Sequence, residues 1–218
     1  DRRRQHLVGE HVGGRAVVVG GGVLTPQIRG HPASLPPIVP PRRSDLRRPG
    51  SAAAVDSSLV TDAQASRRAN VAGLGLIGGS VGLALRARGW HVTGHDHDPT
   101  RVARALEMDV IDVAGFDADA EITFVAVPVT AAAQVAKQAL ADGRGLVTDV
   151  GSVKASVVAA VDDPRFVGGH PMAGREVTGF GASKADLFED HPWIVVPGRV
   201  ATSRDILRVE GLARACGA

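Results

Sequence analysis

The sequence predicts a doubly wound α/β domain over residues 69–218, and two observations carry that prediction. A glycine-rich run from Gly73 to Ser80 follows a short apolar segment and opens an amphipathic stretch. Beyond it, short apolar runs alternate with helix-like segments to the end of the chain, as expected of strands joined by crossover helices. The run at 122–128 is almost wholly apolar, which is typical of a parallel strand covered on both faces.

Each element is predicted from its own pattern of apolar residues and helix caps. Strands are expected at 69–72, 90–94, 122–128, 145–149, 166–168 and 193–196. Helices are expected at 76–88, 99–108, 131–140, 152–161 and 203–215. Asp98 suits the N-cap of the second helix, with Pro99 at its first position. Thr130 and Ser152 suit the N-caps of the third and fourth helices.

The glycine spacing in this context predicts a dinucleotide-binding βαβ unit of the Rossmann type. Gly73 allows the tight turn off the strand, Gly75 leaves room for a pyrophosphate, and Gly78 lets the helix pack closely. The phosphates would meet free N–H groups at Leu76 and Ile77 and the positive end of the helix dipole. An ordinary glycine-rich loop is the alternative, but it would not require the flanking strand and helix patterns.

The residue that follows the second predicted strand indicates which dinucleotide is bound. Asp96 is placed to accept hydrogen bonds from a ribose 2′-OH and would repel a 2′-phosphate, which favours NAD over NADP. Its neighbours His95 and His97 are weakly basic near neutral pH, and Arg101 is the first arginine beyond it. The alternative is a solvated turn residue, but Asp98 fits the helix cap better and leaves Asp96 free for the ribose.

The first 68 residues differ in composition from the rest of the 218-residue chain. They hold 11 Arg, no Lys and 5 acidic residues, a balance of +6, whereas the remainder has a balance of −4. They also hold 7 of the 13 prolines and no aromatic residue, so we expect no packed core there. A transit peptide and a nucleic-acid-binding arm are alternatives, but serine is modest and no aromatics are interleaved. We therefore interpret residues 1–68 as a disordered or non-native leader.

Other composition features limit the classes of protein. Cys216 is the single cysteine, so we expect no internal disulfide and no thiolate metal site, which fits a reducing cytoplasm. We also expect no metal centre, because Cys and His residues do not form a clustered ligand set, and no nucleic-acid partner, because no aromatic residues are interleaved with the arginines. We expect no membrane association, since no apolar run approaches the ~20 residues that span a bilayer.

Three polar or glycine-rich segments follow predicted strands, where ligands bind in doubly wound sheets. They are Val127-Pro128-Val129, the loop Asp149-Val150-Gly151-Ser152-Val153-Lys154, and Gly169-His170-Pro171-Met172-Ala173-Gly174. Together with the run Gly73–Ser80, the latter two resemble prephenate dehydrogenase, and the likeness covers about residues 68–218. The His-Pro-Met-Ala-Gly segment is its most specific part.

The resemblance implies an NAD-dependent oxidative decarboxylation of prephenate to 4-hydroxyphenylpyruvate in tyrosine biosynthesis. Some relatives act on arogenate instead. It also implies a helical C-terminal domain beyond Ala218 that forms a homodimer and closes the substrate pocket. We therefore expect this chain to hold the cofactor domain and part of the active site, and to turn over prephenate poorly by itself. Another NAD(P)-dependent dehydrogenase of the β-hydroxyacid type and a non-catalytic NAD-binding module are the competing hypotheses.

The same resemblance assigns roles to individual residues. His170 would be the catalytic histidine that accepts the substrate proton, the alternative being a structural histidine that bonds loop carbonyls. Ser152 would lie between nicotinamide, substrate and histidine, or serve only as a helix cap. Arg175 would bind a substrate carboxylate or project into solvent. We expect Lys154 to be a solvated charge and Asp149 to anchor its loop. Val127 and Pro128 would line the cofactor site.

Overall fold

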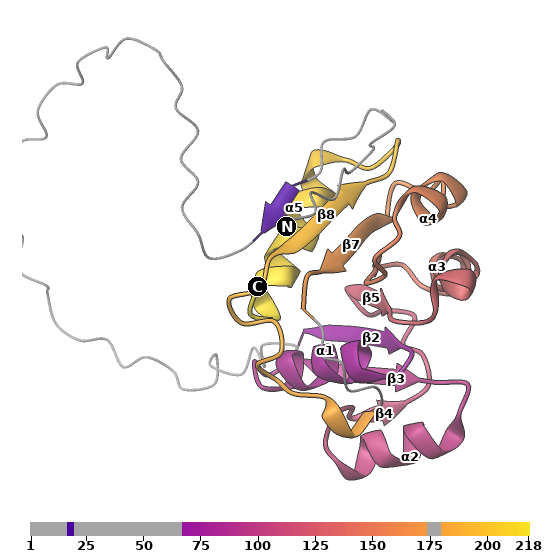
Figure 1. The fold of residues 1–218 in the computed structure, drawn as a ribbon. Helices are drawn as coiled ribbons and strands as arrows, with labels where there is room; N and C mark the ends of the chain where they lie inside the picture. Colours follow the sequence, from indigo (N-terminus) through magenta and orange to yellow (C-terminus); the bar gives the residue numbers. More distant parts are fainter. Residues whose placement is uncertain (1–16, 20–66, 174–179) are drawn as a thin grey trace, which may run out of the picture. The chain divides into compact units, whose positions relative to one another are not determined.

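The computed structural model describes residues 17–19, 67–173 and 180–218 (Figure 1). Its centre is a five-stranded parallel sheet in the order β4-β3-β2-β5-β6. The strands are β2 (Arg68–Ala72), β3 (His91–His95), β4 (Val113–Ala114), β5 (Ile122–Val125) and β6 (Leu146–Asp149). This order is that of a doubly wound dinucleotide-binding fold, in which the strand order reverses beside the first strand. The predicted fold class is therefore confirmed.

A second sheet of three strands has the order β1-β8-β7. It contains β1 (Val17–Val19), β7 (Val167–Pro171) and β8 (Trp193–Pro197). A single parallel bridge between Val147 and Phe166 connects β6 with the start of β7. Strand β8 runs antiparallel to β7, with His170 opposite Ile194. The alternating strand and helix patterns in the sequence did not predict the antiparallel direction of β8.

Strand β1 lies within the segment that we interpreted as a leader. Its residues pair antiparallel with β8, with Val18 opposite Ile194. These three residues thus have regular backbone pairing with β8.

Helices cover both faces of the parallel sheet, and consecutive strand residues point to opposite faces. Phe124 and Leu146 belong to one hydrophobic cluster, whereas their neighbours Val125 and Val147 belong to another. The first cluster includes residues of α1 (Leu76–Arg86), α2 (Pro99–Glu107) and α5 (Ser203–Ala215). The second includes residues of α3 (Val129–Asp142) and α4 (Ala155–Ala160).

The helix starts follow the predicted caps in part. Asp98 caps α2 by accepting from the Thr100 N–H, as predicted. The predicted cap at Thr130 is wrong, since α3 begins at Val129 after Pro128, whose fixed φ suits this position. The predicted cap at Ser152 is also wrong, because α4 begins three residues further on, at Ala155. Serine and threonine in these loops supplied a cap signal that the backbone does not use.

Within the described ranges, every helix is too short or too polar to cross a bilayer. The same residues hold no group of three or more His, Cys, Asp or Glu side chains arranged as metal ligands.

Candidate dinucleotide site and the histidine strand

The carboxyl ends of the parallel strands bring the predicted site segments to one edge of the sheet. The glycine turn follows β2, Asp96 follows β3, Val127 follows β5, and the Asp149–Lys154 loop follows β6. His170 is near the carboxyl end of β7, which starts parallel to β6. The predicted convergence of these segments is thus a property of the fold.

The three glycines of the turn have three different surroundings. Gly73 has a φ of +95°, and a Cβ there would lie 2.5 Å from the Ala126 carbonyl oxygen. A Cβ at Gly78 would lie 1.9 Å from the Gly73 carbonyl oxygen, so α1 packs against the turn at a distance that only glycine allows. A Cβ at Gly75 would meet nothing within 4 Å. Gly73 and Gly78 are therefore required by the packing of the turn, whereas Gly75 faces open space.

The start of α1 can receive an anion. Its N-cap is Gly75, which has no side chain, and the first intrahelical hydrogen bond runs from the Gly79 N–H to the Gly75 carbonyl, 2.8 Å. The amides of Leu76 and Ile77 therefore precede the first bonded turn, where a helix has unpaired N–H groups and the positive end of its dipole. The open space at Gly75 and these amides fit a diphosphate.

Asp96 is engaged by the protein, contrary to the expectation that it is free. Its carboxylate accepts from the Leu74 N–H at 2.7 Å and from the Asp98 N–H at 2.9 Å. The side chain is 3% exposed, His97 Nδ1 lies 2.9 Å away, and Arg101 Nη1 lies 3.7 Å away. Asp96 thus fixes the glycine turn to the end of β3, and any ribose would share a carboxylate that already holds the turn.

The loop after β6 contains a buried ion pair that joins the two sheets. Asp149 is fully buried and pairs with Lys154, whose side chain is only 11% exposed. Lys154 Nζ also donates to the Gly169 carbonyl at 2.8 Å, and Asp149 Oδ1 accepts from the Gly169 N–H at 3.4 Å. Both backbone groups of Gly169 face β6, as an antiparallel partner on the other side allows. The side chains of Lys154 and Asp149 therefore bond to the Gly169 carbonyl and N–H, which have no backbone partner in β6.

This ion pair corrects the expectation that Lys154 is a solvated charge, whereas Asp149 anchors its loop as predicted, also accepting from the Gly151 N–H at 3.1 Å. Burial lowers the pKa of Lys154, and the facing Asp149 opposes that shift. A lysine five residues after a strand-end aspartate was the available sequence signal. Its burial depends on the packing of β7, which the sequence does not reveal.

His170 follows directly on this junction and is partly buried. Burial lowers the pKa of His170, the charge of Lys154 lowers it further, and Asp149 opposes both. Within the part of the chain that the structure describes, no hydrogen bond holds the imidazole, so the carbonyl-bonding alternative has no support there. The lowered pKa favours the neutral form of the ring, and a neutral imidazole can accept a proton.

The remaining predicted site residues are placed less closely. Val127 packs against the turn, since its Cγ1 would lie 3.0 Å from a Cβ at Gly73, and Pro128 caps α3. Ser152 is exposed in the loop before α4. Arg175 lies outside the described residues.

An apolar cavity of about 300 Å³ lies beside His95, lined also by Phe116, Val135, Gln138 and Ala139.

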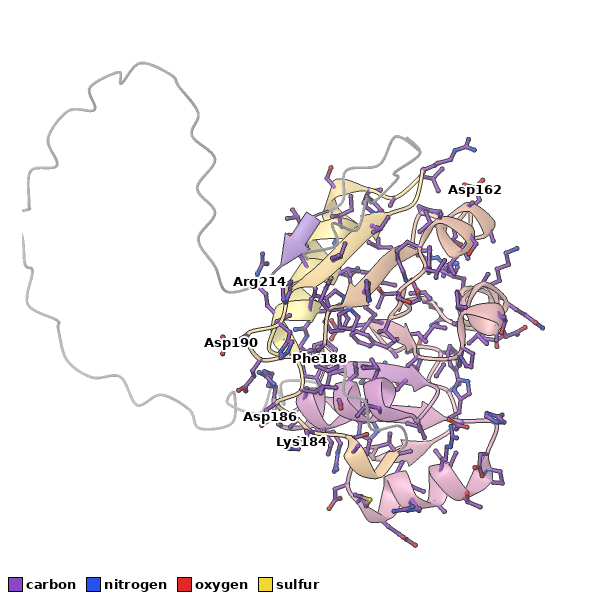
Figure 2. All side chains as sticks on the ribbon, in the orientation of Figure 1. Asp162, Lys184, Asp186, Phe188, Asp190 and Arg214 are labelled. Carbon is purple, nitrogen blue, oxygen red and sulfur yellow. The ribbon has the colours of Figure 1, made fainter. Side chains whose placement is uncertain are left out.

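The sequence reasoning missed the connection between β7 and β8, which contacts the glycine turn. Ser183 Oγ donates to the Leu76 carbonyl at 3.2 Å, and the Lys184 N–H donates to Ser80 Oγ at 3.0 Å. Further along this connection, Phe188 is buried, whereas Lys184 is exposed at the surface (Figure 2). A serine within the glycine run was the available signal for this contact.

The fold and the turn together define a dinucleotide-binding domain. The family model described as prephenate dehydrogenase, nucleotide-binding domain, matches residues 81–218. The chain belongs to the prephenate dehydrogenase family.

Individual relatives agree with this assignment. A prephenate dehydrogenase of Bacillus subtilis is 34% identical over 164 residues, which cover 68% of this chain and 44% of the relative. The crystal structure of prephenate dehydrogenase from A. aeolicus with hydroxyphenyl propionate and NAD+ has a TM-score of 0.65, 27% identity, and coverage of 69% of this chain and 57% of that one. Synechocystis arogenate dehydrogenase has a TM-score of 0.64 with 27% identity over 69% of this chain and 57% of that one. The chain thus spans about half the length of these relatives.

Proposed function

We propose that this chain is the NAD-binding part of an enzyme that oxidatively decarboxylates prephenate to 4-hydroxyphenylpyruvate in tyrosine biosynthesis. The observation that carries the proposal is the placement of His170 on the strand beside the Asp149–Lys154 junction, at the sheet edge that also holds the glycine turn. The family assignment and the A. aeolicus enzyme's complex with NAD+ support the cofactor.

The chain offers specific groups to the cofactor. The amides of Leu76 and Ile77 and the open backbone at Gly75 would hold the pyrophosphate. Asp96 would accept from the adenosine ribose while it holds the turn, and its charge disfavours a 2′-phosphate. When bound, NAD+ supplies a hydride acceptor.

His170 would act on the substrate hydroxyl. The imidazole would take the hydroxyl proton as hydride leaves ring carbon 4. The bond from ring carbon 1 to its carboxylate then breaks, carbon dioxide departs, and the bonding electrons make the ring aromatic. The imidazolium would return its proton to the phenolate oxygen, which gives the 4-hydroxy product. The lowered pKa of His170 keeps the ring neutral and able to accept that proton near pH 7. Lys154 would hold the backbone of β7 and, with it, the imidazole in place. Ser152 and Arg175 remain candidates for substrate contact.

Arogenate is the second candidate substrate, because the Synechocystis arogenate dehydrogenase is as similar in structure as the prephenate enzyme. The two substrates share the ring hydroxyl on which His170 would act, so the chemistry of this domain suits both. The family resemblance supports a homodimer for the longer protein, and the single cysteine supports a cytoplasmic location.

The test has a binding arm and a turnover arm. Calorimetry should detect NAD+ binding to this chain, and His170→Asn should keep the affinity within about twofold, because the ring accepts a proton and holds no phosphate. In a longer protein that contains this chain, His170→Asn should lower kcat by about 10²–10⁴ with prephenate or arogenate. The matched control is His191→Asn, since His191 is exposed. Failure to bind NAD+, or full turnover by His170→Asn, would refute the proposal.

A further inference from the structure

The β7–β8 connection is fastened to the start of α1 by hydroxyl groups. We call residues 180–188 the strap; it begins with the 3-10 turn Phe180–Ala182. Ser183 Oγ lies 3.2 Å from the Leu76 carbonyl oxygen and 3.4 Å from that of Gly75. The Lys184 N–H donates to Ser80 Oγ at 3.0 Å. The strap thus contacts the same helical turn whose amides we assign to the pyrophosphate.

The Ser80 hydroxyl and the Gly75 carbonyl each take part in two of these hydrogen bonds. Ser80 is completely buried, donates its proton to the Leu76 carbonyl at 2.8 Å, and accepts from Lys184 with a lone pair. The Gly75 carbonyl accepts from the Gly79 N–H at 2.8 Å and uses its second lone pair for Ser183. Removal of the Ser80 hydroxyl would leave the Lys184 N–H without its acceptor.

The other end of the strap is held by apolar packing next to the strand of His170. Phe188 is fully buried, and its ring centroid lies 5.2 Å from that of Trp193. Trp193 pairs with Pro171 in the β7–β8 ladder, and its Nε1 would lie 2.8 Å from a Cβ at Gly169. The strap therefore connects the cofactor turn with the two residues that flank His170.

We propose that Ser80 and Ser183 are positioning residues that couple NAD binding at the glycine turn to docking of the strap. The inference rests on the NAD binding proposed above. Docking of the strap holds the first turn of α1 in the conformation that presents its amides, so a docked strap favours the dinucleotide. By linkage, a bound dinucleotide favours the docked strap by the same factor.

The exchange rate of the Lys184 amide hydrogen reports strap docking directly. In the apo chain, Ser80→Ala should speed this exchange about fivefold, because one hydrogen bond is worth ~1 kcal/mol net. NAD+ should slow the exchange in the wild-type chain, and the slowing should be smaller in Ser80→Ala. The same variant should bind NAD+ about fivefold more weakly by calorimetry.

Two further variants separate positioning from general stability. Ser183 is only partly buried, so its substitution should be tolerated. Ser183→Ala should weaken NAD+ binding, whereas Ser183→Thr keeps the hydroxyl and should retain the wild-type affinity. Ser156→Ala, exposed in α4, is the matched control and should leave both the exchange rate and the affinity unchanged. If Ser80→Ala does not fold, the Ser183 pair still gives the answer.

The outcomes distinguish the two proposals. Wild-type affinity in Ser183→Ala, together with Lys184 exchange that does not respond to NAD+, would overturn the coupling and leave the proposed function intact. Absence of NAD+ binding by the wild-type chain would refute the proposed function, and the coupling with it. Loss of affinity in Ser183→Ala with recovery in Ser183→Thr would support the coupling.

Discussion

Lys154 and Asp149 form a buried ion pair whose lysine also donates to the carbonyl of Gly169, the residue that precedes His170. The aspartate is fully buried and the lysine nearly so, and both contact the backbone of β7. The position of the histidine strand relative to the parallel sheet therefore depends on two side chains of opposite charge.

Removal of one partner from this pair should be strongly destabilising. Lys154→Met leaves Asp149 as an uncompensated buried charge, and we expect the free energy of unfolding to fall by about 3–5 kcal/mol. Urea denaturation followed by circular dichroism measures the change. Lys137→Met, which replaces an exposed lysine of α3, should change stability by no more than ~0.5 kcal/mol. Equal stability of the two variants would show that the pair is not structural.

The pKa of His170 should lie below the ordinary value for histidine, because burial and the charge of Lys154 both lower it. An NMR titration of the imidazole measures it directly. In any Lys154→Met protein that remains folded, the pKa should rise relative to wild type, whereas Asp149→Asn should lower it. A His170 pKa above the ordinary histidine value near ~6.5 would contradict this effect of burial and of Lys154.

The sign of the pH effect on stability follows from the same shift. The unfolded chain binds a proton at His170 at a higher pH than the folded chain does, so the unfolded state holds more protons between the two pKa values. The contribution of His170 to stability is thus fully present above the unfolded pKa near ~6.5 and is lost as pH falls toward the folded value. His170→Asn should flatten the decline of Tm with acidification.

Alanine at two glycines of the turn should separate folding from cofactor binding. Gly78→Ala places a Cβ 1.9 Å from a backbone oxygen, so we expect loss of more than ~3 kcal/mol of stability or no folded protein. Gly75→Ala meets no atom within 4 Å and should keep its Tm. Its methyl group enters the space assigned to the pyrophosphate, so NAD+ affinity should fall at least tenfold by calorimetry. Unchanged NAD+ affinity in Gly75→Ala would show that the pyrophosphate does not bind at Gly75.

Substitution of Asp96 should change the choice of dinucleotide. Asp96→Ser removes the carboxylate that holds the Leu74 N–H and frees Arg101, which lies 3.7 Å away, for an anion. NAD+ affinity should fall by about tenfold, since hydrogen bonds to a charged group are worth ~1.5–3 kcal/mol. NADP+ affinity should rise, because repulsion of the 2′-phosphate is removed. Asp162→Ser, far along the chain after α4, should alter neither affinity, and a parallel loss of both dinucleotides would contradict this role.

Cys216 should be inert to thiol reagents in the folded chain. It is fully buried, and burial raises its pKa to about 12, so thiolate is scarce at neutral pH. Ellman's reagent should react with less than one thiol per chain until denaturant is added. Because the folded pKa lies above the unfolded one, the thiol supports stability below pH ~8.5 and that support is lost as pH rises further. Rapid labelling of the native chain would contradict this.

The sequence identified much of the fold because local signals and tertiary packing agree there. The glycine spacing and the Asp98–Pro99 helix start are local patterns, and each forms the element that it predicted. The apolar run at 122–128 also forms a strand, which covers only Ile122–Val125. Thr130 and Ser152 misled because capping residues are also common in ordinary loops. The antiparallel direction of β8 depends on a long connection that carries no periodic signal.

The candidate site was predictable in its backbone parts but not in its buried charges. Glycine identity reports directly on backbone geometry, so Gly73 and Gly78 could be interpreted from spacing alone. Whether Lys154 meets solvent or Asp149 depends on where β7 packs, and Asp96 likewise meets an amide contributed from a distant turn. Ser80 stands out within the glycine run, but its partner Lys184 could not be identified because it lies more than a hundred residues away.

The single bridge between Val147 and Phe166 leaves the boundary between the two sheets short of backbone pairing. Past that bridge, Lys154 and Asp149 bond to the backbone of Gly169, so substitutions of these two residues should change the position of β7 relative to the parallel sheet. An engineer who wished to move His170, the proposed proton acceptor, would start at this boundary and leave the glycine turn unchanged.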